Sequence, residues 1–171
     1  MKRKIGGLKS TTLWLNVRHE TAESHASNPG CIAGHTGLLC HLLGLDAARL
    51  QADDLMTGAA LECLVAGELT KQIAWSETRP GLFHYRTHTQ QEVDFVLEDS
   101  RGRLVGIEVK KTSSPTSGDF KGLRHLSEQA GRKFLRGLLL YTGSTSVAFG
   151  PNLHAVPVSA LWQCEAGLAG A

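Results

Sequence analysis

The chain has 171 residues, which suits a single domain with one core. Apolar residues make up 42% of it and charged residues 20%, so the composition is that of a globular protein and excludes wholesale disorder. No apolar run approaches the ~20 residues that cross a bilayer, and the basic N-terminus lacks the features of a signal peptide. We therefore expect a cytoplasmic protein without a membrane partner.

The net charge of +2 hides an uneven distribution of charged residues along the chain. Residues 37–100 contain four Lys/Arg against ten Asp/Glu, whereas residues 101–136 contain nine Lys/Arg against three Asp/Glu. A basic stretch of this kind can follow a phosphate backbone, as in proteins that bind nucleic acid. It can also be a solvated face without a partner, and the sequence leaves both interpretations open.

The first part of the chain predicts two helices after a poorly defined start. Residues 1–35 show strand character only at 11–17, and they contain no nucleotide-binding P-loop because the glycines that such a loop requires are missing. Leucines at helical spacing then predict a short helix that ends near Gly44: Leu38, Leu39, Leu42 and Leu43. Asp53 and Asp54 can cap a longer helix over about residues 55–73.

Three strand-like segments follow that helix, at residues 82–87, 92–98 and 103–110. After a Ser/Thr/Pro/Gly loop, residues 120–130 are typical of a helix that ends at Gly131. Residues 134–141 predict a largely buried strand, parallel to a neighbour across the helical crossover, and residues 154–158 predict a last short strand.

This order of elements predicts an α/β protein with a mixed central sheet flanked by helices. We assign residues 36–163 to the domain, residues 1–35 to a poorly defined N-terminal segment and residues 164–171 to a flexible tail. The chain has no evident internal repeat.

Alternation along the two central strands separates apolar from charged side chains. Two apolar sets share one face: Val93, Phe95 and Leu97 on the first strand, and Val105, Ile107 and Val109 on the second. Because both sets must face the same core, we expect Asp94, Glu108 and Lys110 to come together on the opposite, polar face of the sheet.

Residues 99–103 fit a five-residue hairpin loop, which pairs Leu104 with Glu98 and sets Glu108 opposite Asp94. Directly opposed side chains have Cβ atoms about 4.5–5.5 Å apart, so two carboxylates there repel each other. A divalent cation between them removes that repulsion, and oxygen ligands of this kind suit Mg²⁺ or Mn²⁺. The other interpretation is an ordinary exposed hairpin with its charges in water. Gly106, which we expect to open the local surface, favours the cation site.

The predicted helix over residues 55–73 carries two more acids near its apolar stripe, with Glu68 inside the stripe and Glu62 at its edge. A carboxylate in such a position is costly unless it is paired or bound to a metal ion. Both acids are therefore candidate ligands, although Glu68 could instead pair with Arg86 and Glu62 could be solvated. Glu68 and Arg86 are accordingly candidates of a second tier.

A series of short motifs runs in order from this helix to the buried strand. The motifs are Leu61-Glu62, Val65, Glu68-Leu69, His84-Tyr85-Arg86-Thr87, Glu92-Val93-Asp94-Phe95, Ile107-Glu108-Val109-Lys110, Asp119-Phe120, Gly122-Leu123 and Leu140-Tyr141-Thr142-Gly143. Over about residues 36–162, the chain resembles the C-terminal domain of unknown function (DUF4143) of bacterial and archaeal AAA-type ATPases. That domain is regarded as a relative of the PD-(D/E)XK nucleases, which include restriction endonucleases and Holliday-junction resolvases.

The resemblance implies a restriction-endonuclease-like core and a role for each matching residue. Asp94 and Glu108 would be metal ligands, helped by the Val109 carbonyl, and the cofactor would be Mg²⁺ or Mn²⁺. Lys110 would be the catalytic lysine, and Glu62 would be the acid of the preceding helix.

The chain departs from this family on its N-terminal side. The ATPase domain with its P-loop is absent, and the family's Asp-(Thr/Ser)-Gly-Leu appears as His35-Thr36-Gly37-Leu38. We therefore expect a domain detached from its ATPase. Its expected partners are DNA and either a second copy of this chain or a separate ATPase subunit.

The sequence leaves three functions open. The first is a metal-dependent nuclease, with the phosphate backbone held by Lys111, Lys121, Arg124, Arg132 and Lys133. The second is a catalytically inactive module of the same fold that binds nucleic acid or protein. The third is a stable remnant that dimerises through a surface once covered by the ATPase domain.

Overall fold

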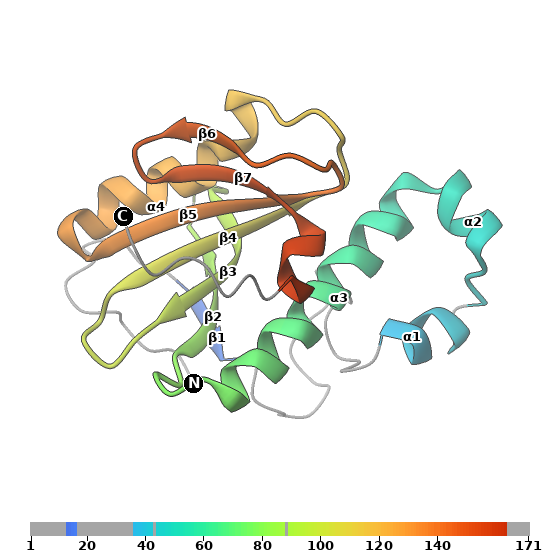
Figure 1. The fold of residues 1–171 in the computed structure, drawn as a ribbon, viewed down its shortest axis with the longest axis horizontal. Coiled ribbons are helices and arrows are strands. Elements are labelled where there is room, and N and C mark those ends of the chain that lie inside the picture. Colours follow the sequence, from blue (N-terminus) through green and yellow to red (C-terminus); the bar gives the residue numbers. More distant parts are fainter. Residues whose placement is uncertain (1–12, 17–35, 43, 88, 164–171) are drawn as a thin grey trace.

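The computed structural model describes residues 13–16, 36–42, 44–87 and 89–163. In these residues one mixed sheet is formed by seven strands: β1 (Leu13–Asn16), β2 (Gly81–Arg86), β3 (Glu92–Glu98), β4 (Leu104–Lys110), β5 (Phe134–Tyr141), β6 (Val147–Gly150) and β7 (Leu153–Pro157). Their order across the sheet is β1-β2-β3-β4-β5-β7-β6 (Figure 1). β1 to β4 are antiparallel neighbours, β5 is parallel to both β4 and β7, and β6 is antiparallel to β7.

The same residues contain four α-helices: α1 (Thr36–Leu42), α2 (Ala47–Ala52), α3 (Asp54–Trp75) and α4 (Lys121–Ala130). α3 begins at a side-chain cap, because Oδ1 of Asp53 accepts the N–H groups of Leu55 and Met56 at 3.0 Å each. α3 and α4 lie on opposite faces of the sheet, while α1 and α2 pack near the start of α3, away from the strands (Figure 1). Short 3₁₀ helices lie at Ser117–Phe120, Gly131–Lys133 and Val158–Trp162.

Each face of the sheet has its own core, because each is covered by one long helix. The α3 core consists of Val65, Ala66, Leu69, Phe95, Ile107, Val109 and Leu140. The α4 core contains, among others, Tyr85, Val93, Val96, Leu104, Phe120, Leu123, Leu126 and Leu139. Burial on both faces explains why the central strands β4 and β5 are apolar along most of their length.

α4 lies close to the sheet because two glycines leave room for it. A Cβ at Gly122 would lie 2.0 Å from the carbonyl oxygen of Glu92, and one at Gly106 would lie 2.7 Å from Cδ2 of Leu123. The first turn of α4 is therefore docked on the start of β3. The expectation that Gly106 opens the local surface is wrong, because that residue is buried beneath α4.

β3 contains a bulge that breaks the alternation of its side chains. The β2–β3 register skips one residue, since consecutive pairs are Phe83–Val96 and Tyr85–Val93. His84 thus lies opposite both Asp94 and Phe95. Val93 and Val96 consequently both lie in the α4 core, whereas Phe95 lies in the α3 core. The prediction that Val93 shares a face with Phe95, opposite a polar face, is wrong for this reason.

The other predicted elements are confirmed with small shifts at their ends. β3 and β5 have the predicted bounds, β4 and β5 are parallel, and the hairpin pairs Leu104 with Glu98 as expected. α2 and β6 were not predicted. β1 comes from the segment of residues 1–35, and the predicted tail of residues 164–171 lies outside the described residues. Among the helices of the described ranges, none is long and apolar enough to cross a membrane.

Candidate functional site

Glu62 reaches the site from α3. It precedes the buried Ala66 by four residues, so it lies on the side of the helix that faces the sheet. Its carboxylate is close enough to interact with the charges of Asp94, Lys110 and Glu92. The structure therefore places an acid of the preceding helix near the central strands, as expected, while its role as a metal ligand stays a prediction.

Asp94 is one of the two bulge residues of β3, and its carboxylate reaches β4. Oδ2 of Asp94 accepts the N–H of Val109 at 2.7 Å. Backbone pairing between β3 and β4 ends at Phe95 and Ile107, so this side-chain bond takes the place of the next rung of the ladder. Because the N–H and C=O of one strand residue point to the same side, the Val109 carbonyl is directed toward the same gap between the strands.

Glu108 and Lys110 form an ion pair at the end of β4, with Nζ of Lys110 2.9 Å from Oε1 of Glu108. Glu108 is only 9% exposed, whereas the Lys110 side chain is 43% exposed. The second carboxylate oxygen, Oε2 of Glu108, is buried and has no hydrogen-bond partner in the described residues. A buried carboxylate oxygen without a partner is costly, so a ligand that met this atom would stabilise the site.

Burial is the main cause that shifts the pKa values of three acids, Glu62, Asp94 and Glu108, which we name the carboxylate cluster. Burial first, and the charge of Asp94 second, raise the pKa of Glu62 and that of Glu108 to about 7. Burial also raises the pKa of Asp94, against the opposing effects of the Val109 N–H and Lys110. For Lys110, burial acts to lower the pKa, but the three carboxylates outweigh it and raise the pKa above its ordinary value.

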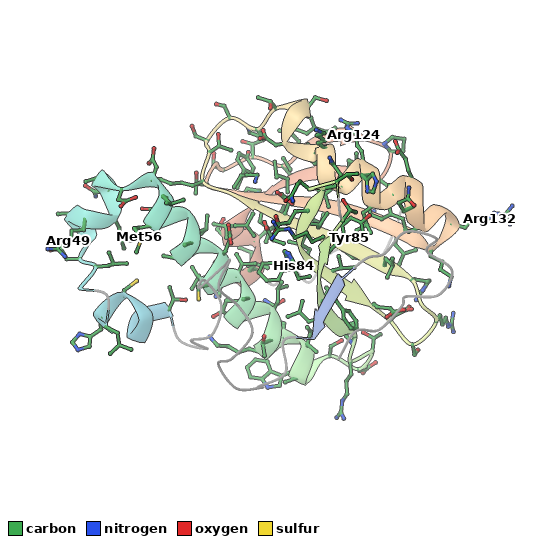
Figure 2. All side chains as sticks on the ribbon, turned by 180° about the vertical axis from the view of Figure 1, so that it is seen from behind. Arg49, Met56, His84, Tyr85, Arg124 and Arg132 are labelled. Carbon is green, nitrogen blue, oxygen red and sulfur yellow. The ribbon has the colours of Figure 1, made fainter. Side chains whose placement is uncertain are left out.

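His84 and Glu92 border the carboxylate cluster, and neither was singled out from the sequence. Nε2 of His84 lies 2.9 Å from Oε1 of Glu92, and Nδ1 lies 3.1 Å from the carbonyl oxygen of Asp94. Figure 2 shows His84 in the middle of the molecule. A signal was present, because apolar residues at both Val93 and Val96 do not fit one alternating strand and indicate a bulge between them.

The donor set of the carboxylate cluster fits a hard divalent cation. Carboxylate oxygens are the ligands that Mg²⁺ and Mn²⁺ prefer, and the unpartnered Oε2 of Glu108 is a donor of this kind. The side chains are not gathered tightly, since the described part of the chain has no group of three or more His, Cys, Asp or Glu arranged to hold an ion. A cation site here therefore requires side-chain rotation toward the ion.

The two second-tier candidates have other partners. Glu68 pairs with Lys71, three residues along α3, with 2.5 Å between Oε1 and Nζ. Arg86 donates from a guanidinium nitrogen to Oε1 of Gln90 at 2.9 Å. The suggestion that Glu68 pairs with Arg86 is therefore wrong.

The five basic residues expected to hold a phosphate backbone fall into two groups. The site end of the sheet has Lys111, which follows β4, and Lys121 and Arg124, in the first turns of α4. Arg132 and Lys133 lie beyond the other end of α4, beside the β3–β4 hairpin, since a Cβ at Gly102 would lie 3.6 Å from Nζ of Lys133. Figure 2 shows Arg132 well apart from Arg124, beyond the far end of α4. β4 separates the two ends of the sheet by about 20 Å.

The fold and this site define an α/β domain with a cluster of buried and half-buried acids where the backbone pairing of β3 and β4 ends. The family model described as "Domain of unknown function (DUF4143)" matches residues 57–161, which include every residue of the carboxylate cluster and Lys110. The chain belongs to this family. A comparison with curated proteins finds no match.

Proposed function

We propose that this domain is a metal-dependent nuclease-like module that acts on DNA, with a PD-(D/E)XK-type site formed by the carboxylate cluster and Lys110. The observation that carries the proposal is that three carboxylates, of which Glu108 is buried, and one ammonium interact by charge although they come from three different elements. Their pKa shifts support it, because groups with shifted protonation that gather at one place are typical of functional sites.

Each residue has a chemical role in this proposal. Asp94 and Glu108 offer carboxylate oxygens from adjacent strands, and the Val109 carbonyl is directed toward the same gap. Glu62 adds a third carboxylate from α3. A bound Mg²⁺ or Mn²⁺ would act as a Lewis acid toward a phosphodiester.

Lys110 supplies a positive charge that is partly exposed and can reach a substrate. Its ammonium donates to Glu108 at 2.9 Å and can turn toward a phosphate oxygen, where it would stabilise the negative charge that develops during cleavage. The nearby carboxylates offset the effect of burial on its pKa, so Lys110 stays positively charged at neutral pH.

The test is cleavage of supercoiled plasmid DNA in the presence of Mn²⁺ or Mg²⁺. We expect Lys110→Ala to lower the rate by about 100-fold or more, because it removes a preorganised charge at the site. Arg101→Gln, which removes a positive charge in the β3–β4 hairpin about 20 Å away, is the matched control and should cleave like the wild type. Equal rates for wild type and Lys110→Ala would refute the mechanism.

A second function, a catalytically inactive module of the same fold that binds nucleic acid or protein, is favoured by one observation. Lys110 already neutralises Glu108, as an internal cation would, and the acids of the described residues are not arranged as a formed ion site. The two functions differ in their response to metal. A cation bound only by the folded chain raises the melting temperature, so a shift at millimolar Mn²⁺ that is lost in Glu108→Gln supports the nuclease, and no shift supports the module.

A further inference from the structure

The bulge in β3 creates a local problem of hydrogen bonding. Two residues, Asp94 and Phe95, occupy the space opposite His84 alone. A bulge disrupts the ladder at this point and leaves backbone groups of the extra residue without their usual partners. A buried carbonyl in this situation must be satisfied by another group.

His84 supplies that group, and its ring touches both sides of the bulge. Nδ1 lies 3.1 Å from the carbonyl oxygen of Asp94, and Nε2 lies 2.9 Å from Oε1 of Glu92. A carbonyl oxygen can only accept, so Nδ1 of His84 is the donor in the contact with Asp94. One side chain of β2 therefore holds the backbone of residue 94 and the side chain of residue 92 on β3.

The direction of the Asp94 carboxylate depends on this bulge. Oδ2 of Asp94 accepts the N–H of Val109 at 2.7 Å, just beyond the last backbone pair of the two strands. Without the extra residue, the strand would continue its regular alternation and residue 94 would present its side chain in a different direction.

We propose that His84 is a positioning residue: by donating from Nδ1 to the Asp94 carbonyl it holds the bulge that aims the Asp94 carboxylate across the gap toward β4. Its effect on cation binding rests on the proposed function, whereas its effect on Asp94 does not. This role depends on one atom, Nδ1 of His84. Replacements that keep or remove the contact of each ring nitrogen therefore have different expected results.

Two replacements separate the contacts of the two nitrogens. His84→Asn keeps an N–H donor near the position of Nδ1 and loses the contact with Glu92, whereas His84→Gln extends toward Glu92. Because the Asp94 carbonyl belongs to the bulge itself, we expect His84→Asn to retain the geometry and His84→Ala and His84→Gln to lose it.

The first measurement needs no metal. Amide hydrogen exchange, followed by NMR in EDTA, compares Val109, whose N–H is held by the Asp94 carboxylate, with Ile107, which pairs with Phe95 in the backbone ladder. We expect His84→Ala to speed exchange at Val109 about 10-fold or more relative to Ile107, and His84→Asn to restore it. Unchanged exchange at Val109, or an equal increase at both amides, would overturn the positioning role.

The second measurement is Mn²⁺ binding, followed by electron paramagnetic resonance, with Asp94→Asn as the variant that lacks the ligand charge. We expect His84→Ala to weaken Mn²⁺ binding about 10-fold or more and His84→Asn to stay close to the wild type, as for other groups that orient metal ligands. Wild-type affinity in His84→Ala would overturn the link to the cation. If the wild type itself binds no Mn²⁺, the proposed function fails, and the exchange at Val109 still decides the role of His84.

Discussion

The acids of the carboxylate cluster hold their protons to a higher pH than isolated side chains do. Glu62 has a pKa of about 7 in the folded chain, against an ordinary value of 4.5. Between these values the folded chain binds more protons than the unfolded chain, so the free energy of unfolding falls as the pH rises. The penalty is absent below pH 4.5 and complete above pH 7.

We expect Glu62→Gln to raise the free energy of unfolding by about 1 kcal/mol at pH 8 and to change it little at pH 4. The neutral amide removes a charge that burial and Asp94 disfavour. Solvent at this half-buried position screens the interaction, which makes the gain smaller than the full pKa shift would give. Denaturant unfolding in EDTA at several pH values measures the difference.

Glu68→Gln is the matched control, because Glu68 lies on the same helix but pairs with Lys71. Loss of that ion pair should cost about 0–0.5 kcal/mol at pH 8 and give no stabilisation. A gain in Glu62→Gln that is the same at pH 4 and pH 8, or that Glu68→Gln reproduces, would contradict the assignment of the penalty to the cluster.

Single residues also show what the sequence could and could not predict about the site. Asp94, Glu108 and Lys110 were predicted to meet, and Lys110 does pair with Glu108 while all three interact by charge. Their functional roles stay predictions. His84 was missed because its importance comes from a bulge, and a bulge depends on how two strands pair rather than on either strand alone.

At the scale of elements, long periodic segments were predictable and short ones were not. The 22-residue α3 has a cap and a repeated apolar spacing, and β5 is apolar at every position except Arg136 and Gly137. α2 has six residues and β6 has four, too few for a period to stand out. The α4 core was missed for a related reason, since the bulge moved Val93 to the other face.

The docking of α4 on β3 gives a prediction for one element. Gly122→Ala should lower the free energy of unfolding by about 2–3 kcal/mol, because its Cβ would lie 2.0 Å from a backbone oxygen of Glu92 and the helix must move away. Thermal or urea unfolding, followed by circular dichroism, measures the loss.

Gly58→Ala is the contrasting substitution. Gly58 lies inside α3 and a Cβ there would meet no atom within 4 Å, so alanine should stabilise the helix by about 0.5–1 kcal/mol. If both variants changed stability in the same direction, the close approach of α4 to β3 would not be the reason for glycine at position 122.

At the scale of the whole molecule, basic residues occupy both ends of α4. A nucleic acid bound at the carboxylate cluster should need Lys121 and not Arg132, because Lys121 begins α4 and Arg132 lies beyond the other end of that helix. For an oligonucleotide of about six nucleotides, we expect Lys121→Gln to weaken binding and to reduce the slope of log K against log salt by about one unit, and Arg132→Gln to change neither.

Fluorescence anisotropy between low and moderate salt measures these slopes. The reverse result, with Arg132→Gln as the weaker binder, would move the binding surface to the hairpin end and separate it from the proposed site. Equal effects of both variants would indicate a general electrostatic attraction between the protein and the nucleic acid, without a defined binding surface.

The order in which the layers occur along the chain has a consequence for synthesis on the ribosome. α3 and the hairpin-linked strands β2 to β4 emerge before β5 and contact sequence neighbours, whereas β5 joins β4 only through the crossover that contains α4. Until Leu140 has been added, the apolar side of α3 lacks one of the residues that pack against it in the α3 core. A nascent chain arrested near residue 110 thus contains all three acids of the carboxylate cluster while the apolar side of α3 is still partly exposed. We expect such a chain to need a chaperone until the parallel strands β5 and β7 have been synthesised.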